Sequence, residues 1–130
     1  MSEHPNAAVL RRAYEAFLRG DFDTLGEVFA PDITWHVPGR SQVAGAHRGR
    51  DAVFAYFGRL MELSGGTFRP DPRDIAASDA HAVSLEHLSA VRAGRTLDVD
   101  LALVVRVQNG QIVEARDYFS DQAAWDEFWG

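Results

Sequence analysis

An acidic residue stands on the apolar face of a strand near the end of the chain. Residues 110–119 read GQIVEARDYF, and because successive strand side chains point to opposite faces, Asp117 shares a face with Val113, Ala115 and Phe119. A carboxyl on an apolar face is costly unless it is paired or keeps its proton, and such carboxyls serve as general acids or bases. Asp117 is therefore a candidate catalytic group. The structural alternative is an Asp that hydrogen-bonds a helix terminus or a loop amide.

Histidines are the other side chains that could act as bases or metal ligands. His81 and His87 share one strand face with Val83 and Leu85, opposite to Glu86, so we expect them on the outer surface. A slip of one residue in the following hairpin would exchange His87 for Glu86 on the inner face. No His or acidic residues have a recognised metal-ligand spacing, and we expect no metal and no cofactor.

Composition narrows the class of protein. The chain has 130 residues, which is enough for one core, and we expect a single domain over residues 1–130. The 13 basic and 19 acidic residues, net charge -6, argue against a nucleic-acid partner. With no cysteine, disulfides and thiol nucleophiles are excluded. We expect a cytoplasmic protein with no membrane contact, because the chain shows neither a signal peptide nor a run of roughly 20 apolar residues.

The first half of the chain has helical periodicity. Gly20 ends the first periodic segment, Asp21 can cap the next, and Pro31 prevents its continuation. A short strand then runs to Pro38, followed by a polar loop and a third helix that Gly65 and Gly66 terminate. The predicted segments are helices over 9–18, 22–29 and 53–61, a strand over 33–37 and a loop over 40–49.

The second half reads as strands. Pro70 and Pro72 indicate an edge or bulged strand over 68–77, since proline cannot donate to a ladder. Turn signals at 92–95 and at Asn109–Gly110 predict an antiparallel meander. The apolar residues from 125 to 129 indicate a short terminal helix or a tail packed on the body. Helices followed by strands give an α+β domain in which a curved sheet wraps the helices.

This order of elements resembles the SnoaL-like branch of the nuclear-transport-factor-2-like superfamily, which includes ketosteroid isomerases. The resemblance implies a cone-shaped domain with three N-terminal helices packed against a curved, mainly antiparallel sheet, and a pocket between them. It identifies a fold well and a reaction poorly, so function depends on pocket residues. The motifs that carry the resemblance are Arg19–Asp23, Phe29–Asp32, Trp35–Gly39, Gly49–Val53 and Asn109–Ile112.

The catalytic positions of ketosteroid isomerases are not filled in this chain. Their tyrosine and two aspartates match Ala13, Val37 and Leu103. Tyr14 is one residue away from the required position, which turns it by about 100° around the helix. We therefore do not expect steroid-type isomerisation.

The limonene-type epoxide hydrolases are more similar at the C-terminal strand. They share the Arg116–Phe119 motif and use its Asp as catalytic acid or base, and their partner Asp aligns with Glu86. Two carboxyls facing each other in an apolar cone would couple, so that one keeps its proton near neutral pH while the other acts as base. However, the family's bridging Arg aligns with Ser84, and its water-positioning Tyr and Asn align with Trp35 and Val37. The water-activating set is therefore incomplete.

The resulting hypothesis is a cofactor-free acid-base enzyme that uses Asp117 and Glu86 on a small apolar cyclic or polyketide-like substrate. Epoxide hydrolysis and aldol-type cyclisation are both open as the reaction, and dehydration ranks third behind them. The alternative is a non-catalytic protein that binds a small hydrophobic molecule. We also expect a homodimer through the outer sheet face. The resemblance implies it, since members of the family commonly dimerise, and a monomer would leave the polar and apolar side chains of this face exposed. The expected substrate-binding residues are Tyr14, Phe17, Trp35, Val37, Phe57, Ser84, Leu88, Leu103 and Phe119.

Overall fold

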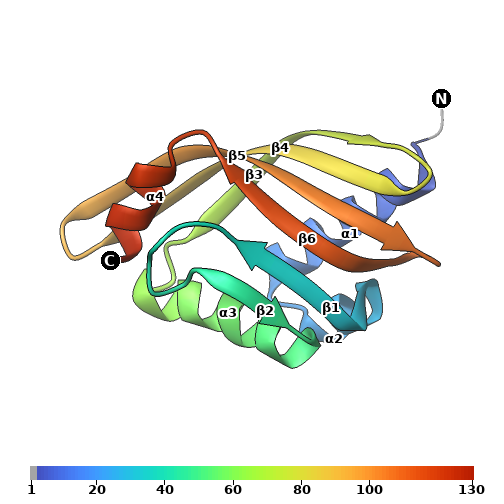
Figure 1. Ribbon diagram of the computed structural model, residues 1–130, viewed down its shortest axis with the longest axis horizontal. Coiled ribbons are helices and arrows are strands. Elements are labelled where there is room, and N and C mark those ends of the chain that lie inside the picture. The colour runs from blue at the N-terminus through green and yellow to red at the C-terminus, as the bar shows by residue number, and fades with distance from the viewer. Residues whose placement is uncertain (1–2) are drawn as a thin grey trace.

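The computed structural model describes residues 3–130, as four helices packed against one six-stranded sheet (Figure 1). This is the α+β architecture predicted from the order of the periodic segments. The helices are α1 (Pro5–Arg19), α2 (Phe22–Val28), α3 (Arg50–Leu63) and α4 (Gln122–Trp129). The strands are β1 (Phe29–Val37), β2 (Gly45–Arg48), β3 (Arg69–Ala77), β4 (His81–Arg92), β5 (Arg95–Gln108) and β6 (Gln111–Phe119).

The sheet is curved and unclosed, with the strand order β2-β1-β6-β5-β4-β3. Strands β3 to β6 form the predicted antiparallel meander, while β1 runs parallel to β6. Helix α1 packs on β3 and β4, α3 packs on β1 and β2, and α4 packs on β5. The core therefore lies between the helices and the concave face of the sheet.

Local sequence signals set the ends of the first two helices. Gly20 adopts φ 68°, and its N–H caps the carbonyls of Ala16 and Phe17. The side chain of Asp21 accepts a hydrogen bond from the Thr24 N–H and begins α2. Both predictions are confirmed. Pro31, however, lies inside β1, which begins four residues before the predicted strand, and the β1–β6 register is irregular between Phe29 and Thr34.

Three other segments differ from the sequence-based expectation or refine it. The polar loop contains β2, a four-residue strand that pairs antiparallel with the end of β1. Its residues are mostly exposed, so no apolar alternation marked it. Strand β3 is the predicted bulged edge strand, with its register shift between Pro72 and Asp74. The apolar tail forms α4, which the Asp121 side chain caps.

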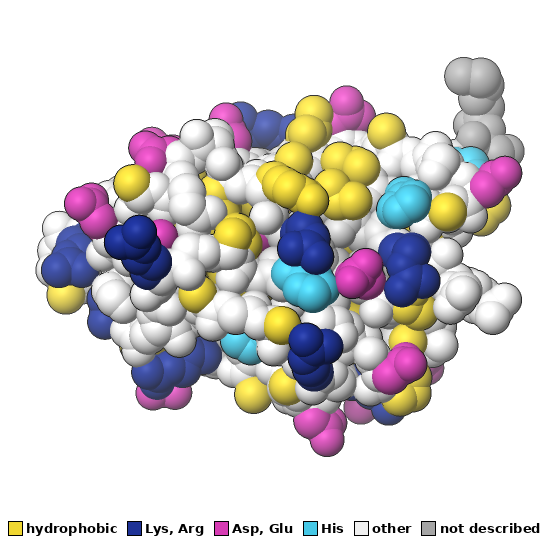
Figure 2. All heavy atoms as spheres, in the orientation of Figure 1, with side chains coloured by type: hydrophobic (Ala, Val, Ile, Leu, Met, Phe, Trp, Pro, Cys, Tyr) yellow, Lys and Arg dark blue, Asp and Glu magenta, His cyan; other side chains and the backbone are white. Residues whose placement is uncertain are grey.

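The outer face of the sheet carries both apolar and charged side chains (Figure 2). Leu85 and Tyr118 are 52% and 54% exposed there. His87 lies on the same outer face, where its Nε2 is 2.5 Å from Asp98 and its Nδ1 is 2.8 Å from Asp100. These carboxylates raise the pKa of His87.

Within residues 3–130, no helix is long and apolar enough to cross a membrane.

Candidate active site

Hairpin geometry decides which side chains face the interior. Ala93 and Gly94 between β4 and β5 have φ values of 49° and 78°, and Asn109 and Gly110 between β5 and β6 have 53° and 76°. Positive φ at both central residues is typical of two-residue hairpin turns whose twist matches the strands. The turns leave β4, β5 and β6 in continuous register around the site, so the one-residue slip does not occur.

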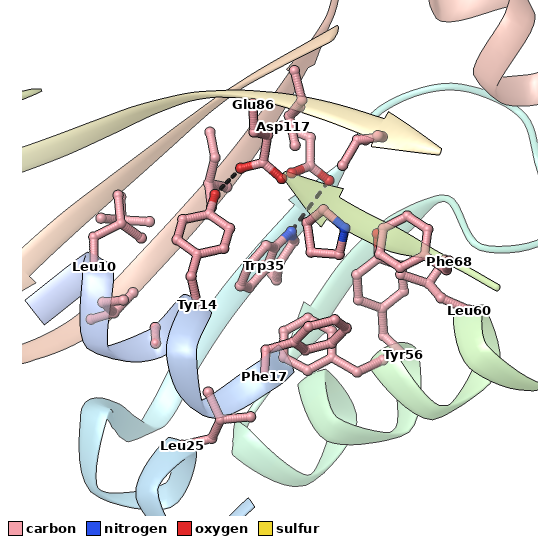
Figure 3. A pocket seen from close by; sticks show the side chains of 18 of the residues that line it. Leu10, Tyr14, Phe17, Leu25, Trp35, Tyr56, Leu60, Phe68, Glu86 and Asp117 are labelled. Carbon is pink, nitrogen blue, oxygen red and sulfur yellow. Dashed lines mark hydrogen bonds between the residues drawn. The ribbon is translucent and has the colours of Figure 1, made fainter. Parts of the chain in front are cut away.

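This register brings two carboxyls together on the concave face. Ser84 pairs with Leu103, which in turn pairs with Asp117, and Glu86 pairs with Leu101. Glu86 and Asp117 are therefore diagonal neighbours across β5, and their carboxyl groups point toward one another (Figure 3). Their side chains belong to residues only 5% and 3% exposed. The expected orientation of both acids is confirmed, although their roles stay predictions.

Each carboxyl is held by its own hydrogen-bond donors. The indole Nε1 of Trp35 donates to Asp117 Oδ2 at 3.3 Å. The Tyr14 hydroxyl donates to Glu86 Oε2, and Ser84 Oγ donates to the same oxygen at 3.0 Å. The side chains that orient the two acids thus come from α1, β1 and β4.

Tyr14 and its neighbour Ala13 both face inward. A turn of about 100° around the helix separates the two positions. Both residues line the same cavity, and Tyr14 reaches Glu86. The apolar stripe of a helix that packs on a sheet is itself at least about 100° wide, so adjacent positions can both face inward.

The two acids have unequal proton affinities. Burial raises the pKa of Glu86 to about 9, and the charge of Asp117 adds to this. Burial also raises the pKa of Asp117 to about 7, while the hydrogen bond from Trp35 opposes that rise. Near neutral pH, Glu86 keeps its proton and Asp117 exists in both forms. The pair can therefore supply a general acid and a general base at the same time.

The carboxyls open into an apolar cavity between the helices and the sheet. The space open to the centres of water molecules is about 70 Å³, several times the roughly 10–15 Å³ that one water needs. Seven of the predicted binding residues line it, namely Tyr14, Phe17, Trp35, Phe57, Leu88, Leu103 and Phe119.

Two predicted binding residues do not line the cavity. Val37 lies one strand repeat beyond Trp35, where β1 exits to Pro38, and lines a neighbouring groove, which Asp117 and Phe119 also line. Ser84 is fully buried and contacts the site through its hydrogen bond to Glu86. Both were expected in the wall because alternation places them on the inner face, but alternation does not say how far a cavity extends along a strand.

Tyr56 is a cavity residue that the sequence analysis missed. It is 5% exposed, and its ring stacks on His47 with a centroid distance of 4.5 Å. Burial and the charge of Asp117 hold the pKa of its hydroxyl well above 10. The spacing of Val53, Tyr56, Phe57 and Leu60 is that of one helix face, and this signal would have found it. The other unpredicted wall residues are Leu10, Ala13, Leu25, Phe29, Leu60, Phe68, Pro70, Leu101, Val105, Ile112 and Trp125.

Two further histidines, His36 and His47, do not line the cavity. His36 Nε2 is 3.0 Å from Glu114 Oε2, and that interaction lowers the pKa of Glu114. His47 bonds the Val43 carbonyl at 2.9 Å. Across residues 3–130, no group of three or more His, Asp or Glu side chains is arranged to hold a metal ion.

The fold and the buried carboxyl pair define a class of small α+β domains with an interior cavity. The model of the SnoaL-like domain matches residues 10–115 of the chain. The protein therefore belongs to the SnoaL-like family, as the sequence motifs indicated.

Similar proteins cover the whole chain. An uncharacterized protein of Mycobacterium tuberculosis is 35% identical over 130 residues, which are 99% of each chain. The structure of Bal32a, from a soil-derived mobile gene cassette, has 42% identity and a TM-score of 0.94 over 97% of each chain. A Xanthomonas campestris protein of unknown function with a cystatin-like fold has 36% identity and a TM-score of 0.88, covering 96% of this chain and 98% of that one.

Proposed function

We propose that this protein is a cofactor-free acid-base enzyme that acts on a small apolar cyclic or polyketide-like substrate. The observation that carries the proposal is the facing pair of Glu86 and Asp117, two buried carboxyls with unequal pKa values at the wall of an apolar cavity. Pairs of titratable groups whose surroundings separate their pKa values are the usual sign of acid and base assignments.

The mechanism assigns one step to each carboxyl. Ionised Asp117 removes a proton from a carbon next to a substrate carbonyl, and protonated Glu86 donates its proton to the carbonyl oxygen as the enol forms. Attack of the enol carbon on a second carbonyl then forms the new carbon–carbon bond of an aldol-type cyclisation. The enol O–H proton returns to Glu86 and the proton taken up by Asp117 passes to the oxygen of the second carbonyl, which restores both acids. Tyr14 and Ser84 orient Glu86, and Trp35 orients Asp117.

Epoxide hydrolysis by the same pair is the second reaction that we consider. It needs a water molecule held beside the base, and the chain has Trp35 and Val37 at the positions of the family's water-positioning residues. Ser84, at the position of the bridging Arg, is engaged with Glu86. These substitutions favour proton abstraction from carbon over water activation.

Proton exchange tests the proposal without knowledge of the natural substrate. We expect the protein to accelerate deuterium uptake at the α-carbon of 2-tetralone in D2O, followed by NMR. Asp117→Asn should reduce the acceleration on the order of a hundredfold. An epoxide of similar size, tested alongside, reports on the second reaction. If the ketone binds but neither reaction is accelerated, the protein is a ligand carrier and the proposal is rejected.

A further inference from the structure

We propose that this cavity binds a protonated amine, with its ammonium group hydrogen-bonded to Asp117 and its apolar ring among the aromatic walls. This inference goes beyond the proposed function, because an ammonium group on Asp117 occupies the base of that mechanism; it names a further class of ligand, an apolar ring compound with a basic nitrogen. Three features of the cavity support it: an unused acceptor atom, uncompensated charge and the arrangement of the rings.

The first feature is an acceptor that the protein leaves unused. Within residues 3–130, the side-chain donors of the site bond Oδ2 of Asp117 and Oε2 of Glu86, and none of them bonds Oδ1 or Oε1. Both residues are more than nine-tenths buried and line the cavity. Glu86 keeps its proton near neutral pH, and with two donors on Oε2 that proton belongs on Oε1, so the open acceptor is Oδ1 of Asp117. An ammonium N–H can bond this oxygen.

The second feature is charge. The cavity wall contains two carboxyls, and no Arg or His side chain lies among the wall residues of the described chain. The sequence contains no lysine at all. A buried carboxylate without a nearby cation is strongly disfavoured, and the raised pKa values of both acids are the consequence. The cation that would stabilise an ionised Asp117 must therefore arrive with the ligand.

The third feature is a group of three aromatic rings beside Asp117. The ring centroids of Trp35 and Phe57 are 5.2 Å apart, those of Tyr56 and Phe57 are 5.7 Å apart, and those of Trp35 and Tyr56 are 6.3 Å apart. Trp35 also donates to Asp117, so the rings and the carboxyl belong to one region. Aromatic faces attract cations, most strongly where both groups are removed from water.

A neutral ligand uses these features less completely. A ketone can only accept, so it could bond the proton of Glu86 but would leave Asp117 without a donor. An alcohol can accept from Glu86 and donate to Asp117, but it has no charge to balance that of Asp117. The comparison of an amine with an alcohol of the same shape therefore separates the proposal from simple apolar binding.

The probes are 2-aminotetralin and 2-tetralol, which share one ring skeleton and differ only in the polar group. Isothermal titration calorimetry at pH 8 should give the amine a Kd at least tenfold below that of the alcohol. The groups facing Asp117 are Glu86 from β4 and Tyr56 from α3. Only Asp117, with its pKa of about 7, gains its charge between pH 5 and pH 8. The preference for the amine should therefore shrink toward equality at pH 5.

Matched variants locate the effect. Asp117→Asn should bring the Kd of the amine at pH 8 to within threefold of the Kd of the alcohol. The control is Asp100→Asn, the same chemical change on the outer face of the sheet, where Asp100 contacts His87; it should keep the full preference.

Equal Kd values for the two probes on the wild-type protein at pH 8, or no binding of either at millimolar concentration, would overturn the amine proposal, and these two readings need no variant. An amine preference that persists unchanged in Asp117→Asn would also reject it. The deuterium-exchange assay judges the enzyme proposal separately: exchange without an amine preference removes only this inference, whereas an amine preference without exchange indicates a carrier of amines.

Discussion

The hydroxyl of Tyr14 on α1 donates a hydrogen bond to the carboxyl of Glu86 on β4, 72 positions further along the chain. This contact connects the first helix to the more basic of the two buried acids. It also explains why Glu86 has a defined orientation although its surroundings are otherwise apolar. The role of the residues that orient the acids can therefore be tested by substitution, as can the role of the acids.

We predict that Tyr14→Phe lowers turnover about two- to tenfold with little change in KM, because one lost hydrogen bond is equivalent to roughly 0.5–1.5 kcal/mol. Ser84 still donates to Glu86 in this variant, so the effect should be smaller than that of removing an acid. The control is Tyr118→Phe, since Tyr118 is 54% exposed. Identical kcat values for the two variants would show that Tyr14 has no positioning role.

The pH dependence of folding stability should reflect the buried acids. The pKa of Asp117 is about 7 in the folded protein, against 3.8 for the free side chain, and that of Glu86 is about 9 against 4.5. The folded state therefore binds more protons than the unfolded state between the two values of each acid, and stability must fall as pH rises from about 4 to 9. We expect a lower Tm at pH 9 than at pH 5.5.

A double variant, Asp117→Asn with Glu86→Gln, should remove most of this decline in Tm. A smaller slope should remain, because the pKa of His87 is also raised and its contribution is likewise lost as pH rises. Thermal melting of both proteins between pH 5.5 and 9 is the measurement. A wild-type Tm that increases over this range would contradict the assignment of raised pKa values.

Gly39 should be intolerant of substitution. Its φ is 106°, and a Cβ atom there would meet the side chains of Asp126 and Gln122 on α4. We expect Gly39→Ala to destabilise the protein by about 1–3 kcal/mol. The matched control is Gly58→Ala inside α3, where a Cβ meets nothing within 4 Å; this change should stabilise by about 0.5–1 kcal/mol. Chemical denaturation of both variants tests the contrast in sign.

We also predict a homodimer formed through the outer face of the sheet. Leu85 and Tyr118 are more than half exposed there, and a monomer would leave them in water. Leu85→Glu should shift the mass measured by light scattering toward that of a monomer. Leu18→Glu, a similar change at a residue of α1 that is 44% exposed, should not. A wild-type monomer at every concentration from micromolar to millimolar would rule the dimer out.

Alternation predicted the acid pair because the strands pair regularly around the two acids. The β5–β6 register shifts once, between Arg106 and Val107, nearer to the turn than the pairing of Leu103 with Asp117. The same reasoning could not predict β2, whose exposed residues have no apolar face. Local pattern thus sufficed wherever one face of an element is buried and the element is uninterrupted.

The helical half of the site was less predictable. A helix face admits neighbouring positions, so sequence spacing alone could not decide between Ala13 and Tyr14, and both line the cavity. Tyr56 was missed for a related reason, since the third helix was judged by its most apolar residues. The extent of the cavity, which excludes Val37, depends on how distant elements pack and has no local signal.

The parallel pairing of β1 with β6 has a consequence for the order of assembly. Trp35 and Asp117, which share a hydrogen bond, are 82 positions apart, and contacts of such separation form late because loop closure must come first. A chain that has only the helices and the β3–β5 meander in place has no complete binding site. Any molecule held by this cavity should therefore leave the folding rate unchanged and retard unfolding, so that it prolongs the lifetime of the native state.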